Sequence, residues 1–295
     1  MASDPTFTHL IQELYSNSYV EHLGSISDII KYCKPKGFLT KSLLELLPKV
    51  FDVLEIIVED CWSSYIDENL QSMLDSPELY VSHVMMTCWV ERNTVPDIYD
   101  RFLIVITFVN YLADMIYCTT AKKYYVLTSK ILTVFFENVL KEDFKKRGGW
   151  KRLEKHILNK KYLEYHDECL AYDFIVQDIP KDLKRKLRDS YAPLRNSVSN
   201  IAEIINSNSL IQNLIREVLH SVDTSLLMEL SSPTLNEEHL DSKDAEGSSS
   251  TEANVLEDPD MHLREIDYRL CERRLKRFEE KLGQLISIFE LLEAE

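Results

Sequence analysis

The sequence predicts an all-α fold: a helical bundle around a central hydrophobic helical hairpin, with a C-terminal amphipathic or coiled-coil helix. Three observations predict it. Glycine and proline are scarce, with six and nine among 295 residues, and such a composition favours helices over sheets. Apolar residues recur at helical spacing along most of the first 230 residues. The segment 101–118 is apolar on nearly every face, as expected of a helix buried inside a protein.

Two amphipathic stretches open the chain. Residues 7–34 carry apolar side chains at helical spacing until a KPKG sequence interrupts the pattern. A longer run, 39–74, predicts a second helix. Ser76 as N-cap and Pro77 at the first helical position predict the start of the next helix, which extends to about residue 91.

The hydrophobic segment 101–118 is predicted to be the central helix. Asn110 and Asp114 interrupt its second half, so the strongly apolar part is shorter than the roughly 20 residues that span a bilayer. We therefore favour a buried core helix over an integral membrane segment. A second apolar helix is expected at 122–145, and a short connection between two helices predicts an antiparallel hairpin.

Two of the six glycines, Gly148 and Gly149, lie side by side just after this hairpin and directly before Trp150. Glycine adopts the left-handed backbone conformation that commonly ends a helix. One of the two glycines is therefore predicted to stop the hairpin's second helix.

The glycine pair lies in a basic stretch, 141–161, which holds nine Lys or Arg against three acidic residues. A nucleic-acid interface is one interpretation. The stretch lacks interleaved aromatic residues and a wider basic surface, so we favour a solvated helix end and expect no nucleic-acid partner.

Helical patterns resume at 150–172 and 180–230, the latter interrupted near Pro193 and at 206–209. Residues 223–260 hold eleven acidic residues and one lysine. Such a composition is typical of a disordered linker.

The last segment has a heptad pattern. It could form a coiled coil or fold back as an amphipathic helix, and both alternatives stay open. The apolar positions are Tyr268, Cys271, Leu275, Phe278, Leu282, Leu285, Phe289 and Leu292.

Four parts are therefore expected in the chain. A helical bundle occupies 1–175, and additional helices at 176–230 pack on it. An acidic linker at 231–260 leads to the heptad helix at 261–295.

Motifs of catalysis are missing from the sequence. It contains no phosphate-binding GxxxxGK[ST] loop, GxGxxG fingerprint, HExxH zinc motif or GxSxG elbow. The six cysteines form no CxxC pair and lie 27 or more residues apart, as do buried thiols of intracellular proteins. The HDE sequence at 166–168 fits a polar helix surface better than a metal site. We expect no enzyme, no cofactor and no metal.

Two motifs resemble the Bcl-2 family of apoptosis regulators. The sequence KRGGWKRL (146–153) is similar to the family's second homology region, which carries Gly-Gly-Trp. The sequence IYDRFLIVITF (98–108) is similar to the first homology region, Asn-Trp-Gly-Arg, with Tyr99 in place of the Trp and Arg101 in place of the Arg. Arg101 precedes Trp150 by 49 residues, a spacing that matches the family.

Two further segments carry weaker likeness. The sequence LEIIVEDCWSSY (54–65) is similar to the third homology region, although Val58 and Glu59 replace its Gly and Asp. Residues 27–38 resemble the fourth. In the first region, Ile98 and Asp100 replace the family's Asn and Gly.

The resemblance covers about residues 25–165 and implies a mechanism. A partner's amphipathic helix lays its apolar face in a hydrophobic groove, and Arg101 pairs with an aspartate of that helix. Phe108 and Tyr65 line the groove. Tyr99 and Ile104 complete the expected contact residues.

Alternative roles stay open for these residues. Arg101 could instead cap or pair locally, and Phe108 and Tyr65 could belong to the core. Trp150 is expected to be a packing anchor.

The resemblance implies a regulator of apoptosis that is cytoplasmic, with a peripheral place on mitochondria or a nuclear place left open. No apolar C-terminal tail is recognised that would anchor it in a membrane. The alternative function is a helical scaffold or adaptor that forms homo-oligomers through residues 268–292.

Overall fold

A computed structural model describes residues 4–20, 39–191 and 209–231 of the chain. These residues form helices joined by turns, and no strand occurs among them. The all-α prediction is thus confirmed. The chain divides into two units, and the first, Met1–Ser232, contains every described residue. The predicted acidic linker and heptad helix fall almost entirely in the second unit, Pro233–Glu295, and apart from Ser231 they lie outside the described residues.

The first three helices begin where the sequence signals place them. They are α1 (Pro5–Val20), α2 (Lys41–Asp75) and α3 (Pro77–Thr94). The Ser76 hydroxyl accepts a hydrogen bond from the Leu79 amide at 3.2 Å, which confirms the predicted N-cap. Thr40 caps α2 in the same way and accepts from the Leu43 amide at 2.9 Å.

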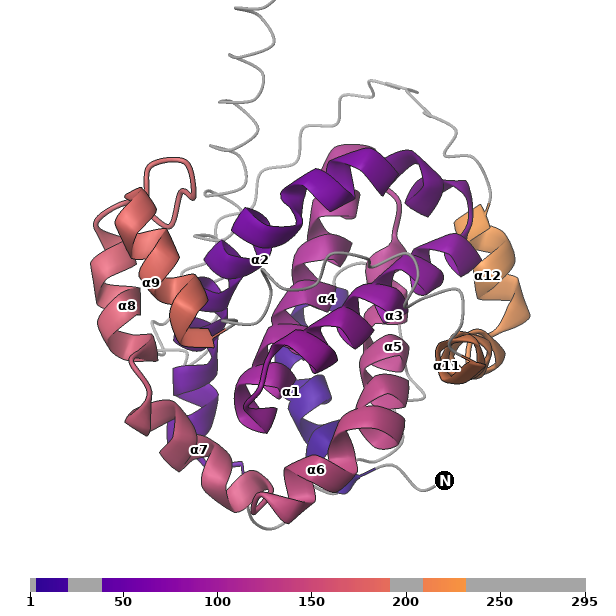
Figure 1. Cartoon of the computed structure of the whole chain (residues 1–295). Helices are drawn as coiled ribbons and strands as arrows, with labels where there is room; N and C mark the ends of the chain where they lie inside the picture. Colours follow the sequence, from indigo (N-terminus) through magenta and orange to yellow (C-terminus); the bar gives the residue numbers. More distant parts are fainter. Residues whose placement is uncertain (1–3, 21–38, 192–208, 232–295) are drawn as a thin grey trace, which may run out of the picture. The chain divides into compact units, whose positions relative to one another are not determined.

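Helix α4 (Ile98–Thr120) is the central helix. It packs against α2 and α3 and against the helical segments that follow it in the chain (Figure 1). Its length and hydropathy are enough to cross a membrane, and 61% of its most apolar window is buried inside the protein. Burial of this kind fits the core helix that the sequence predicts.

The second arm of the hairpin is helical throughout but irregular. It runs as a 3₁₀ turn (Tyr124–Leu127), α5 (Thr128–Phe135), a π-helical turn (Phe136–Leu140) and α6 (Lys141–Lys146). Each of these segments contacts α4. The predicted helix at 122–145 is therefore present, although a π turn, which the sequence does not signal, interrupts its middle.

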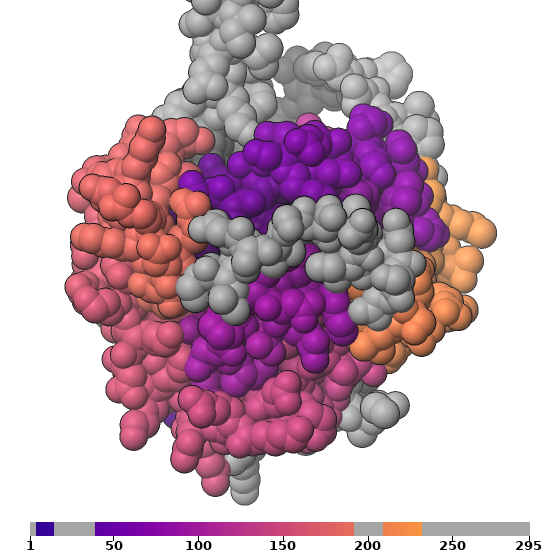
Figure 2. Space-filling model, in the orientation of Figure 1, coloured from indigo at the N-terminus to yellow at the C-terminus, as the bar shows by residue number. Residues whose placement is uncertain are grey.

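The remaining helices cover the outside of the bundle. α8 and α9 pack on α2, whereas α11 packs on α3 and α5, and α12 on α3 (Figure 1). Figure 2 shows the α8–α9 segment and the α11–α12 segment on either side of α2 and α3. The five helices are α7 (Trp150–Asn159), α8 (Tyr162–Leu170), α9 (Lys181–Tyr191), α11 (Ser209–His220) and α12 (Thr224–Ser231).

Candidate functional site

The glycine pair ends the hairpin as predicted. Both residues have positive φ, +117° at Gly148 and +60° at Gly149. The Gly149 amide donates to the Phe144 carbonyl at 2.8 Å, and the Gly148 amide donates to the Lys145 carbonyl at 3.0 Å. These bonds satisfy carbonyls at the end of α6 that would otherwise lack partners. The chain can then turn directly into α7.

Trp150, at the start of α7, is the packing anchor that the sequence predicts. Its side chain is 7% exposed. The ring lies 4.8 Å from Phe144 and 5.5 Å from Phe102, centroid to centroid, both edge-on. Phe7 of α1 stacks on the same cluster, 4.2 Å from Phe136. The cluster therefore joins α1, both arms of the hairpin and α7.

Tyr99 connects the two motif-like segments. It is buried, and its hydroxyl donates to the Gly149 carbonyl at 3.2 Å. Its ring packs edge-on against Phe144, with 5.2 Å between centroids. The first turn of α4 and the glycine pair, about 50 residues apart in sequence, are thus in direct contact.

Arg101 lies at the protein surface, where it has a local role. Its Nε donates to the Val95 carbonyl at 3.0 Å, and its terminal nitrogen donates to the Pro96 carbonyl at 3.4 Å. It also borders a surface pocket of about 350 Å³. The other residues that line this pocket are Pro96, Asp97, Ile98, Asp143, Lys146 and Arg147.

The expected groove-lining residues are packed in the core. Ile104 and Phe108 have no exposed surface, and Phe108 lies 5.7 Å from the Trp62 ring. Tyr65 is half-buried, and its hydroxyl lies 2.7 Å from Nδ1 of His83, which links α2 to α3. Burial raises the pKa of Tyr65 to about 12, so this hydroxyl keeps its proton. A partner could contact Phe108 and Ile104 only after these helices moved.

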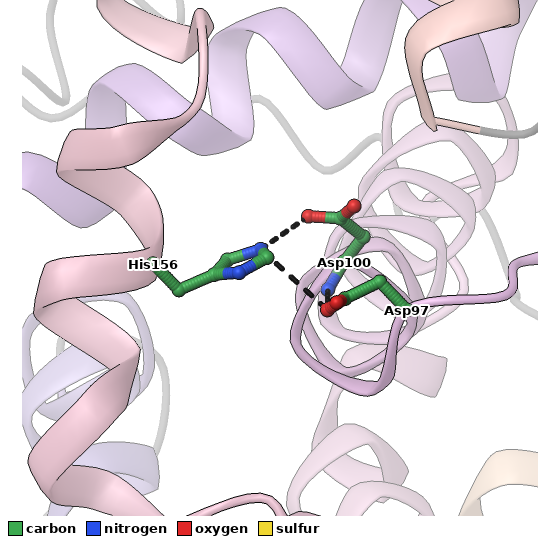
Figure 3. A group of neighbouring side chains, drawn as sticks. All are labelled: Asp97, Asp100 and His156. Atoms are coloured by element: carbon green, nitrogen blue, oxygen red, sulfur yellow. Dashed lines mark hydrogen bonds and ion pairs between the residues drawn. The ribbon is translucent and has the colours of Figure 1, made fainter.

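A buried charge network lies beside the predicted site. Asp97 caps α4, accepting from the amides of Tyr99 and Asp100, and the side chain of Asp100 is 3% exposed. The Asp100 carboxylate faces His156 of α7, whose Nε2 lies 2.6 Å from Oδ1 (Figure 3). Asp100 also accepts from Lys160 Nζ at 2.7 Å and from the Tyr162 hydroxyl at 2.9 Å.

These contacts keep the carboxylate charged. Burial by itself would raise the pKa of Asp100. The hydrogen bonds from His156 and Lys160, together with the electrostatic effect of both groups, lower the pKa by more than burial raises it. The pKa of Asp100 therefore lies below its ordinary value. An ionised carboxylate can only accept hydrogen bonds, so Nε2 of His156 must be the donor. For Tyr162, burial and the charge of Asp100 both raise the pKa.

The same group of side chains has to be considered as a cation site. Oxygen atoms of Asp97 and Asp100 and a ring nitrogen of His156 lie within 4.8 Å of one another (Figure 3). However, the ammonium of Lys160 already lies on Asp100 Oδ2, and Nε2 of His156 points its proton at Oδ1. The arrangement is therefore that of an ion-pair network, in which the protein itself supplies the positive charge.

Sequence reasoning did not identify Asp100, His156, Lys160 and Tyr162 as one site. A partial signal exists, because Asp100 is an acid within an apolar segment, and His156 and Lys160 lie four residues apart in the basic stretch. No family model matches this chain, and no curated protein or solved structure was found to be similar to it.

Proposed function

We propose that this chain is a Bcl-2-like regulator of apoptosis that binds an amphipathic helix of a partner protein. The observation that supports it most is the contact between Tyr99 and Gly149. It brings together the two segments that resemble the family's first and second homology regions. Between them lies a buried apolar hairpin, which is the part that such a fold needs as its centre.

The pocket beside Arg101 is suited to an acidic residue of the partner. Arg101, Lys146 and Arg147 line it with three positive charges, against the two negative charges of Asp97 and Asp143. Arg101 donates to backbone carbonyls through two of its nitrogens, which fixes the guanidinium in place. A partner's carboxylate can accept from its remaining donors, because a guanidinium carries five N–H groups.

The apolar face of the partner would lie along α4. Because Phe108 and Ile104 are fully buried, binding has to be accompanied by a movement of α2 and α3 away from α4, a closed-to-open change. The contact between Tyr65 and His83 lies where these two helices meet. We therefore expect slow association, since binding waits for the rare open state.

A fluorescence titration tests the proposal. The probe is a labelled synthetic helical peptide, apolar at i, i+3/i+4 and i+7, with one aspartate on its polar edge. We expect binding, at least tenfold weaker for Arg101→Glu, or about 1.4 kcal/mol. The matched control is Arg216→Glu, on the exposed face of α11, which should bind as the natural chain does.

A double-mutant cycle then identifies the ion pair. Replacing the peptide's aspartate by asparagine should weaken binding to the natural chain but not to Arg101→Glu, where it removes a repulsion between two carboxylates. The absence of binding to every peptide in a panel, or equal weakening by the two arginine variants, would contradict the proposal. Circular dichroism of each variant shows that it is folded.

The alternative function rests on the heptad at 268–292. In this alternative the chain is a scaffold that oligomerises through residues 268–292. Sedimentation of the full chain and of a chain lacking 261–295 separates the two. Oligomers that disappear on the deletion would favour the scaffold, whereas monomers throughout would leave it without support.

A further inference from the structure

A second hollow is lined by residues of α2 and α9. These two helices pack against each other (Figure 1). The volume of the hollow is about 460 Å³. Every side chain that lines it is charged. Those residues are Asp60, Lys181, Lys184, Arg185, Arg188 and Asp189.

The geometry of α9 places its positive charges together. Lys181 and Arg188 are seven residues apart, with Lys184 and Arg185 between them, so the four share one face of the helix. The adjacent face holds the helix against the bundle through three buried side chains. Those are Leu183, Leu187 and Tyr191. The basic face is therefore part of a fixed surface.

The charges within the hollow are only partly neutralised. Four cations and two carboxylates line the hollow, and the carboxylate of Asp182 pairs with Arg185 at 2.8 Å beside it, which leaves a balance of +1 in a chain whose net charge is −15. Arg188 pairs with Asp60 at 3.0 Å, and Lys184 donates to the Val176 carbonyl at 3.0 Å. Nε of Arg188 is buried and makes no hydrogen bond within the described part of the chain. The net positive charge of the lining therefore favours an anionic ligand.

We propose that this hollow binds a small polyanion that carries two or more phosphate groups. Its volume lies in the range of about 300–1,000 Å³ that is usual for small-molecule sites. Its all-charged lining disfavours an apolar ligand, because such a ligand would remove these charges from water without compensation.

The length of the basic face indicates more than one phosphate. From Lys181 to Arg188 the helix axis advances about 10 Å, at 1.5 Å per residue. The two arginines lie three residues apart, and their planar guanidinium groups match phosphate oxygens in pairs. Lys181 and Lys184, which precede the two arginines, add point charges. A single phosphate would engage only part of this row.

Calorimetric titration of the full chain with tripolyphosphate tests the site. We expect saturable binding that weakens at least tenfold in Lys181→Gln/Arg185→Gln, and that falls steeply with added salt. The control, Lys151→Gln/Lys155→Gln, removes two equally exposed charges from α7 and should change the affinity less than twofold. Thermal melting of both double variants shows that each is folded.

The phosphates could come from a soluble molecule or from a lipid headgroup, and a second titration separates these sources. It uses phosphatidylcholine vesicles with and without a bisphosphorylated phosphoinositide. If the chain binds the phosphoinositide vesicles and only Lys181→Gln/Arg185→Gln loses this binding, the site is supported and its ligand is a lipid headgroup. If neither probe binds, or if both double variants lose binding equally, the hollow is not a phosphate site.

Discussion

Replacing Asp100 by asparagine tests the charge network that joins α4 to α7 and α8. The variant keeps the size of the side chain and one acceptor oxygen but removes the negative charge. Lys160 then loses its counter-ion and His156 loses a charged acceptor, and their side chains are only 33% and 13% exposed. The perturbation is therefore electrostatic, with little change in packing.

The magnitude follows from this burial. Removing one partner of a fully buried pair costs about 3–5 kcal/mol. Because Lys160 keeps a third of its exposure to water, we expect the lower end, about 3 kcal/mol. With a urea m value of about 3 kcal/mol/M, the unfolding midpoint falls by about 1 M. Asp143→Asn is the control, since its pair with Lys146 is 3.7 Å long and exposed, and it should cost less than about 0.5 kcal/mol.

The pH dependence has a definite sign. The pKa of Asp100 is lower in the folded state than in the unfolded chain, so its contribution is present above the unfolded value of about 4 and is lost as pH falls through the folded pKa. The stability difference between the natural chain and Asp100→Asn should thus be present at pH 5 and shrink below about pH 4.

A double-mutant cycle with Lys160→Gln completes the test. The lysine substitution should cost at least about 1 kcal/mol less in the Asp100→Asn background, because its partner is already absent. Urea unfolding followed by circular dichroism measures all four proteins. An Asp100→Asn variant within 0.5 kcal/mol of the natural chain, or additive effects of the two substitutions, would refute an ion-pair network at this position.

Two further predictions concern the hairpin exit and the α2–α3 contact. Gly149→Ala should lower the free energy of unfolding, measured in urea, by about 1–3 kcal/mol. Backbone strain alone is the cause, because φ is +60° and a new Cβ would meet no atom within 4 Å. An unchanged stability would mean that the turn relaxes. Burial lowers the pKa of His83, so the unfolded chain binds more protons, and stability should fall as pH drops below about 6.5. In His83→Gln this part of the fall in stability should be absent. If the variant and the natural chain show the same pH profile of thermal melting, His83 is not the group responsible.

Features with local signals could be predicted from the sequence. The N-cap at Ser76 and the helix stop at Gly148 and Gly149 depend on residues that are adjacent in the chain, and the structure has both. The central position of α4 follows from its apolar residues on all faces. The predicted heptad at 268–292 lies outside the described residues.

The charge network depends on a break that has no such signal. The sequence predicts one helix over 150–172, whereas the structure separates α7 and α8 at Lys160 and Lys161, where neither glycine nor proline occurs. Lys160 takes an extended conformation there, with φ −94° and ψ 164°. This break aims Lys160 and Tyr162 at the buried carboxylate. Tertiary electrostatics thus override local helix propensity at this point.

Two differences from the Bcl-2 motifs that the sequence resembles account for each other in this structure. The first homology region of that family has a glycine where this chain has Asp100. The second homology region usually has polar or acidic residues where this chain has the basic stretch 141–161. A carboxylate buried at Asp100 needs hydrogen-bond donors and a cation close by; His156 of the basic stretch supplies a donor and Lys160 the cation. Part of the basic stretch is therefore internal counter-charge to α4. The other basic residues of the stretch include Lys151 and Lys155, which are exposed, as expected on a solvated helix face.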